Sequence, residues 1–207
     1  MRSPRFLIVA LLLAAGIAGG AWLLSAGLPF GRGEPETATV LPIPLPLTEF
    51  TLTDHNGDPF TRASLQGDWH LLFFGFTHCP DICPATLQQL SIARKRLAEA
   101  GHAPLPDIVM VSVDPERDTT EKLARYVSNF GDGIKGVTGR YDQLQALAKP
   151  LGIYYEYEPP DDDGNYNISH SVAVMVINPQ AELKALFSAP HDVSAFVSDL
   201  PLIVSAQ

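Results

Sequence analysis

Two long apolar runs constrain the fold more than any other feature of the chain. The first, WHLLFFGF, occupies residues 69–76, and the second, DIVMVSVD, occupies residues 107–114. A strand that is exposed on one face alternates apolar and polar side chains, whereas a strand buried on both faces is nearly continuously apolar. Both runs are therefore predicted to be interior strands of a sheet that other elements cover on both sides.

Helical patterns lie between and beyond these runs. Residues 83–100 repeat apolar side chains with helical spacing and stop before Gly101, and residues 119–130 begin with a capping threonine and stop before Gly131. Strands that alternate with helices predict an α/β fold with a central mixed sheet and helices on both faces. The other predicted elements are a hairpin at 50–60, a short strand at 136–139, a helix at 141–153 broken near Pro150, two strands within 171–188 and a closing helix at 191–204.

The N-terminal segment is apolar enough to cross a membrane. Residues 6–24 contain no charged side chain and follow Arg2 and Arg5. About 20 apolar residues span a bilayer as a helix, and arginines before the span favour a cytoplasmic N-terminus. A cleaved signal peptide is the alternative, although its apolar region usually has only about 7–15 residues. We expect a single-pass protein of the bacterial inner membrane whose soluble domain lies in the periplasm.

The chain divides into an anchor at residues 1–28, a linker at 29–47 and a folded domain at 48–207 on this interpretation. The linker is rich in Pro and Gly, and its PIPLPL tract is expected to be extended and stiff.

The chain has 23 acidic and 14 basic residues and a formal net charge of −9. Nucleic acid binding requires a basic footprint, so nucleic acid is excluded as a partner.

Cys79 and Cys83 are the only two cysteines of the chain. They follow the first apolar run, where the chain turns into a helix, and open α/β sheets place their sites at such strand ends. The partial positive charge of a helix N-terminus favours thiolate. A disulfide that closes so short a loop adds little stability, so a purely structural role is disfavoured. A redox couple and a metal site stay open.

His170 is the best candidate for a third metal ligand, because it stands at a loop edge before an apolar strand. Met110 and Met175 lie in predicted core strands and are expected to pack rather than ligate. Two thiolates and one imidazole suit copper or zinc. A structural zinc site usually has four protein ligands, so a three-ligand site that accepts and releases copper fits better. The other histidines have structural interpretations, at His55, His70, His78, His102 and His191.

Three segments resemble the Sco (SenC/PrrC) family, and the similarity extends over residues 48–203. They are FTHCPDICP with its two cysteines, SVDPERD at residues 112–118, and SHSVAVMVINPQ with His170. The resemblance implies a membrane-tethered, thioredoxin-like protein of copper delivery to cytochrome c oxidase. It further implies that Cys79, Cys83 and His170 bind Cu(I) or Cu(II).

Some positions depart from the family pattern or have two interpretations. Ser169 stands where the family often has Asp before the histidine, which removes a charge beside the ligand. The charged residues of segment 114–118 are interpreted either as solvated turn residues or as a loop that flanks the copper site. The acidic stretch 161–163 is expected to be a solvated loop, or part of a flap that carries His170.

The expected function is delivery of copper to, or preparation of, the CuA site of cytochrome c oxidase. The alternative is a thiol–disulfide oxidoreductase in which Cys79 and Cys83 reduce the CuA-ligand cysteines or answer a redox signal, without need of His170. A peroxidase ranks lower, because no activating arginine is identifiable beside the cysteines. The expected partner is the CuA-bearing oxidase subunit, and a second periplasmic copper chaperone or a thioredoxin-like reductant is a candidate. Whether the chain is an enzyme stays open.

Overall fold

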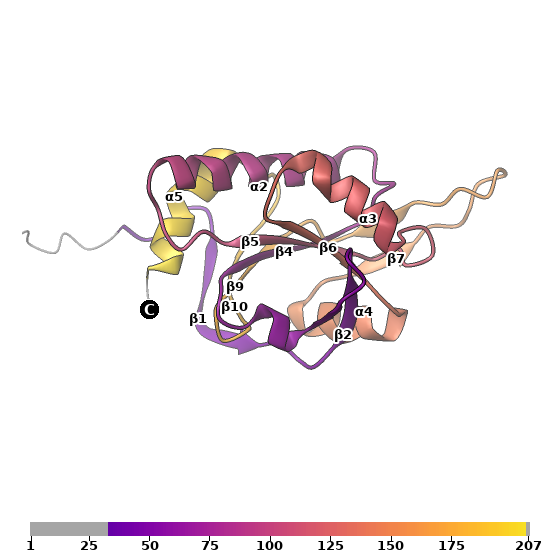
Figure 1. Cartoon of the computed structure of the whole chain (residues 1–207), viewed down its shortest axis with the longest axis horizontal. Helices are drawn as coiled ribbons and strands as arrows, with labels where there is room; N and C mark the ends of the chain where they lie inside the picture. The colour runs from indigo at the N-terminus through magenta and orange to yellow at the C-terminus, as the bar shows by residue number, and fades with distance from the viewer. Residues whose placement is uncertain (1–32, 206–207) are drawn as a thin grey trace, which may run out of the picture. The chain divides into compact units, whose positions relative to one another are not determined.

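Eight strands form one mixed sheet in the computed structural model, which describes residues 33–205 (Figure 1). The strand order is β1-β10-β9-β4-β5-β6-β2-β3, and the parallel neighbouring pairs are β4–β5 and β5–β6. The prediction of a central mixed sheet is confirmed. The strands are β1 (Thr39–Pro46), β2 (Thr51–Asp54), β3 (Pro59–Thr61), β4 (His70–Gly75), β5 (Asp107–Ser112), β6 (Ile134–Thr138), β9 (Val174–Ile177) and β10 (Glu182–Phe187).

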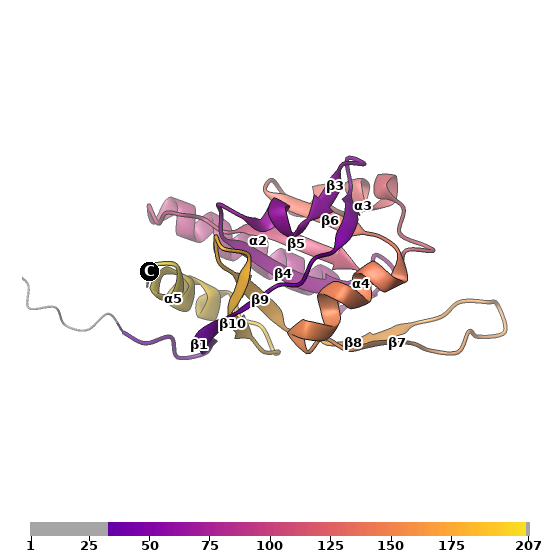
Figure 2. The same cartoon turned by 90° about the horizontal axis from the view of Figure 1, so that it is seen from below.

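Helices cover both faces of this sheet, as predicted. Figures 1 and 2 show α2, α3 and α5 on one face and α4 on the other. Strand β4 serves both cores, because Leu71 and Phe73 pack toward α2 and α5 while Leu72 and Phe74 pack toward α4. The helices are α2 (Ile82–Glu99), α3 (Thr120–Val127), α4 (Tyr141–Ala148) and α5 (Val193–Val204), with 3-10 turns η1 (Arg62–Leu65), η2 (Ser128–Phe130) and η3 (Lys149–Leu151).

A separate two-stranded hairpin joins α4 to the last part of the sheet. Its strands are β7 (Tyr155–Tyr157) and β8 (Ile168–His170), and Tyr155 pairs with His170. The acidic stretch 161–163 lies in the loop between the two strands, and its side chains are exposed. The expected solvated loop is therefore confirmed, and the same hairpin carries His170 at its base.

The prediction that residues 29–47 form a linker is wrong for its second half. Residues 39–46 form β1, which pairs with β10 at the edge of the sheet. Proline lacks an N–H, but an edge strand has a row of unpaired backbone groups that tolerates it. The buried carboxylate of Asp199 accepts hydrogen bonds from the backbone of Thr37 and Ala38 at 2.8 and 2.9 Å. The folded domain thus begins before residue 48.

The predicted membrane anchor at residues 1–28 lies outside the part of the chain that the structure describes. Within residues 33–205, no helix combines the length and the hydropathy needed to span a bilayer.

Candidate metal centre

Cys79 and Cys83 lie where β4 passes into α2. Cys83 is in the first turn of the helix and fully buried, whereas Cys79 is half-buried in the preceding loop. The backbone N–H of Cys83 lies 3.4 Å from Cys79 Sγ and donates to it. Pro84 also occupies the first turn, where no intrahelical N–H is required. The strand end and the helix start therefore hold both sulfur atoms on one side of the sheet edge.

His170 closes the site from the β7–β8 hairpin. Its Nε2 lies 3.6 Å from Cys83 Sγ, and the three candidate ligand atoms all lie within 4.8 Å of one another. Its Nδ1 lies 3.0 Å from the carbonyl oxygen of Ser171. A carbonyl only accepts, so Nδ1 carries the proton and the lone pair of Nε2 faces the thiols. Phe76 packs against the imidazole at a centroid distance of 5.8 Å and fixes the ring plane.

The two thiols differ strongly in acidity. The hydrogen bond from the Cys83 thiol lowers the pKa of Cys79 to about 4, and backbone N–H groups of the helix start add to this effect. The same hydrogen bond and complete burial raise the pKa of Cys83 above its ordinary value. The pair therefore shares one negative charge, which lies on the more accessible sulfur.

This asymmetry predicts selective alkylation of the copper-free, reduced protein. Iodoacetamide should modify Cys79 at least about tenfold faster than Cys83, because it is both ionised and accessible. The rate at Cys79 should stay nearly constant from about pH 6 to 8, whereas an ordinary thiol gains about tenfold per pH unit there. Peptide mass mapping of time points measures both rates. Equal rates, or a steep pH dependence at Cys79, would contradict the assignment.

Gly75 is a positioning residue that the sequence alone did not reveal. A Cβ at this position would lie 2.8 Å from Cys83 Sγ and 3.0 Å from Cε2 of Phe73. Both neighbours are buried, so neither can give way easily. The only available signal was the glycine inside an otherwise bulky apolar strand, which marks a close approach.

Gly75→Ala should therefore displace the Cys83 thiol. We expect a loss of about 1–3 kcal/mol in the free energy of unfolding from overpacking, with weaker metal binding. Urea unfolding and copper titration of the variant measure the two effects. Gly33→Ala is the matched control, because an added Cβ there has nothing within 4 Å. A Gly75→Ala protein that matches this control in both measurements would contradict the tight approach.

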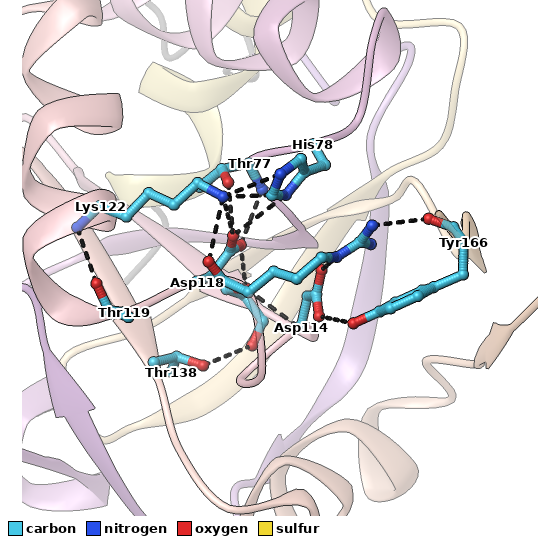
Figure 3. Close-up of polar contacts among 10 residues, drawn as sticks. Thr77, His78, Asp114, Asp118, Thr119, Lys122, Thr138 and Tyr166 are labelled. Carbon is cyan, nitrogen blue, oxygen red and sulfur yellow. Dashed lines mark hydrogen bonds and ion pairs between the residues drawn. The ribbon is translucent and has the colours of Figure 1, made fainter. Parts of the chain in front are cut away.

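Asp118 ties the cysteine loop to the neighbouring strand (Figure 3). Its fully buried carboxylate accepts hydrogen bonds from the backbone and hydroxyl of Thr77 at 2.8 and 2.5 Å, and from the hydroxyl of Ser112 at 2.6 Å. Lys122 lies 3.7 Å from the same carboxylate. Thr77 lies two residues before Cys79. By holding Thr77, Asp118 fixes the position at which the cysteine loop leaves β4.

Asp114 makes the corresponding connection to the histidine hairpin. It is fully buried, receives a hydrogen bond from the Tyr166 hydroxyl at 2.7 Å and pairs with Arg117 at 2.5 Å. Arg117 also donates to the backbone carbonyl of Tyr166 at 2.8 Å. The interpretation of residues 114–118 as solvated charges is thus wrong for the two aspartates. The segment instead braces the cysteine loop and the histidine hairpin against each other.

His78 does not join the thiols, in agreement with the structural interpretation expected for it, and it lies in a turn before Cys79. Its ring lies 3.1 Å from Lys122 Nζ and 3.9 Å from Asp118. It approaches Asp114 and Asp118 closely enough to resemble a metal site. Both carboxylates already accept hydrogen bonds or ion pairs from this chain, however, so the arrangement is a braced polar network rather than a set of free ligands.

Ser169 has no part in orienting the imidazole. Side chains alternate along a strand, and the Ser169 hydroxyl donates at 2.8 Å to Glu158, which lies just beyond the end of β7. The Nδ1 proton of His170 has a backbone acceptor that does not depend on the identity of residue 169. The missing family aspartate therefore leaves the ligand geometry intact.

Met110 and Met175 are buried in the core, as expected.

The family profile described as SCO1/SenC matches residues 45–205. The chain belongs to the SCO1/SenC family. It is 39% identical to the mitochondrial SCO2 homologue of Bos taurus over 84% of this chain, and it spans 65% of that relative's length.

Solved structures of the family share the fold described above. ScoI of Arabidopsis thaliana with copper bound is 31% identical and superimposes with a TM-score of 0.73, over 77% of this chain and 98% of that one. Yeast Sco1 with copper bound is 27% identical with a TM-score of 0.73, over 79% and 91% of the two chains. The thioredoxin-like fold expected from the resemblance is thus confirmed.

Proposed function

We propose that this chain binds one copper ion through Cys79, Cys83 and His170 and serves assembly of the CuA site of cytochrome c oxidase. The observation that carries the proposal is the convergence of two sulfurs and one imidazole nitrogen within 4.8 Å. Soft thiolates select Cu(I), and imidazole together with thiolate also accommodates Cu(II). The copper-bound state of two family members supports the same choice of metal.

The three-ligand donor set suits a copper ion that is passed on to another protein better than a permanent structural ion. A structural zinc site usually has four protein ligands, and among residues 33–205 these three side chains have no fourth such group within reach. Cys79 lies half-exposed in a loop rather than inside an element. A partner thiol could therefore approach the metal from the side of Cys79 and displace it.

Membrane attachment through residues 1–28, with the folded domain in the periplasm, completes the proposal. It rests on the apolar run at 6–24 and the preceding arginines. Such an anchor would tether the copper site to the membrane that carries the proposed oxidase partner. The CuA-bearing subunit is the proposed recipient.

A second function, thiol–disulfide exchange, is favoured by the unequal exposure of the two thiols. The accessible Cys79 thiolate would attack a partner disulfide and form a mixed disulfide. Cys83 would then lose its proton and attack Cys79 Sγ, which releases the partner's second thiolate. Two electrons pass to the partner, and this chain leaves with a Cys79–Cys83 disulfide. No step uses His170.

One experiment separates the two functions. The reduced full-length chain in non-ionic detergent, with and without copper, is mixed with a CuA domain whose cysteines are either reduced or oxidised. Delivery predicts that copper appears on the reduced domain and that His170→Ala abolishes this transfer. Exchange predicts that the oxidised domain is reduced equally well by wild type and His170→Ala. Absence of copper transfer from the loaded wild type would rule out the delivery function.

A further inference from the structure

The β7–β8 hairpin carries an unbalanced charge. It contains Glu156, Glu158 and the three aspartates of 161–163, and no Lys or Arg occurs from residue 150 to residue 183. Figures 1 and 2 show the hairpin projecting from the folded unit beyond α4. It therefore offers an accessible acidic surface.

An exposed aromatic surface lies at the base of this hairpin. We define it by Tyr141 of α4, Tyr157 of β7 and Tyr166 of the hairpin loop, which line a hollow of about 400 Å³ together with Glu116 and Glu158. The ring centroids of Tyr141 and Tyr157 are 6.5 Å apart, and those of Tyr157 and Tyr166 are 5.9 Å apart. Tyr141 is 55% exposed, and exposed clustered aromatic rings mark interaction surfaces.

The aromatic surface continues into a second hollow of about 430 Å³. Tyr141 and Tyr157 line both hollows, and the second adds Tyr154, which is 62% exposed, and Glu156. No basic side chain lines either hollow. The combined surface thus offers neutral ring faces beside three carboxylates, and none of these carboxylates forms an ion pair within residues 33–205.

The buried side of the same cluster already binds a guanidinium group. The Cζ atom of Arg117 lies 3.6 Å from the ring centroid of Tyr166, and its Nε pairs with Asp114. A ring face, a carboxylate and the backbone carbonyl of Tyr166 together hold this arginine. The solvent side repeats the pairing of ring faces with carboxylates, with Tyr141 and Tyr157 as rings and Glu116 and Glu158 as carboxylates.

We propose that the aromatic surface is the docking surface for a basic segment of a partner protein, with a Lys or Arg side chain seated in the hollow. Tyr157 of this surface lies on β7, and β7 pairs with the strand β8 that carries His170, so a segment bound here lies one strand away from the candidate metal ligand. That the docked partner exchanges copper rests on the proposed function, whereas the docking itself does not.

A labelled peptide of alternating Arg and Gly tests the surface by fluorescence anisotropy with the full-length chain in non-ionic detergent. Tyr141→Ala should weaken binding by about threefold or more, because it removes a ring face. Tyr141→Phe keeps that face and should bind like wild type. The double variant Glu116→Gln with Glu158→Gln should weaken binding by about tenfold at near-physiological salt.

A charge-matched control separates docking from general attraction to an acidic protein. Glu99→Gln with Asp132→Asn removes the same charge from residues that do not line either hollow, and it should bind the peptide like wild type. Equal weakening in this control, or unchanged binding by Tyr141→Ala, would overturn the proposal. Copper binding by the same docking variants should be unchanged. A wild type that binds the peptide but no copper would defeat the proposed function and leave the docking surface standing.

Discussion

His170→Ala should weaken copper binding by at least about 100-fold, since loss of a mere outer-shell partner of a ligand already costs about 10–100-fold. Among residues 33–205, the variant removes the only histidine within reach of the two sulfurs. It removes the imidazole contact with the thiols but keeps the hydrogen bond from the Cys83 N–H to Cys79 Sγ. Copper should therefore be lost while the reducing capacity of the thiols persists.

Competition with a chromogenic Cu(I) chelator measures this loss. His102→Ala is the matched control, because His102 is exposed and follows the C-terminal end of α2, whereas the cysteines lie at its N-terminal end. The copper affinity of this variant should equal that of wild type. Titration of the thiols with a disulfide reagent should give the same count in all three proteins. A His170→Ala affinity within a few-fold of wild type would remove the histidine from the proposed ligand set.

Asp118→Ala should lower the free energy of unfolding by about 3–5 kcal/mol, which places it among the largest single-residue effects. The substitution leaves the Thr77 N–H and two hydroxyl donors without their charged acceptor, and hydrogen bonds to charged groups contribute about 1.5–3 kcal/mol each. It also leaves Lys122 beside an empty space. The cysteine loop should lose its fixed exit from β4, so metal binding should weaken as well.

Urea unfolding compares this variant with Asp142→Ala. Asp142 is an exposed aspartate in the first turn of α4 that pairs with Arg140 on the surface, and its loss should cost no more than about 0.5 kcal/mol. Asp118→Asn should fall between the two, because an amide keeps one acceptor oxygen but turns a donor toward Thr77. A loss below about 1 kcal/mol for Asp118→Ala would contradict its bracing role.

The elements that sequence patterns predicted are those whose signal is local. The runs at 69–76 and 107–114 became β4 and β5 because continuous apolar sequence requires burial on both faces. The strand–helix junction at Cys79 and Cys83 was also predictable, because an apolar run precedes the cysteines and helical spacing follows them. Strand β1 was missed, because a proline-rich tract has the composition of a linker and only its pairing with β10 makes it a strand.

The features that sequence patterns could not predict depend on contacts between distant segments of the chain. His170 was a candidate ligand from its position at a loop edge and from the family resemblance, but it lies 87 residues from Cys83, so their approach depends on where the β7–β8 hairpin places the imidazole. Strand β8 has three residues, too few for a period to be visible. Asp114 and Asp118 follow a strand as surface turn residues do, and their burial arises from partners at Thr77 and Tyr166 in distant segments.

X-ray absorption of the copper-loaded, full-length chain tests the central claim most directly, because it counts the donor atoms around the metal. We predict one copper ion per chain, bound by two sulfur atoms and one imidazole nitrogen, with the nitrogen signal absent from His170→Ala. A copper ion with sulfur donors alone in wild type, or with a nitrogen signal that persists in His170→Ala, would contradict the assignment of Cys79, Cys83 and His170 as one copper site.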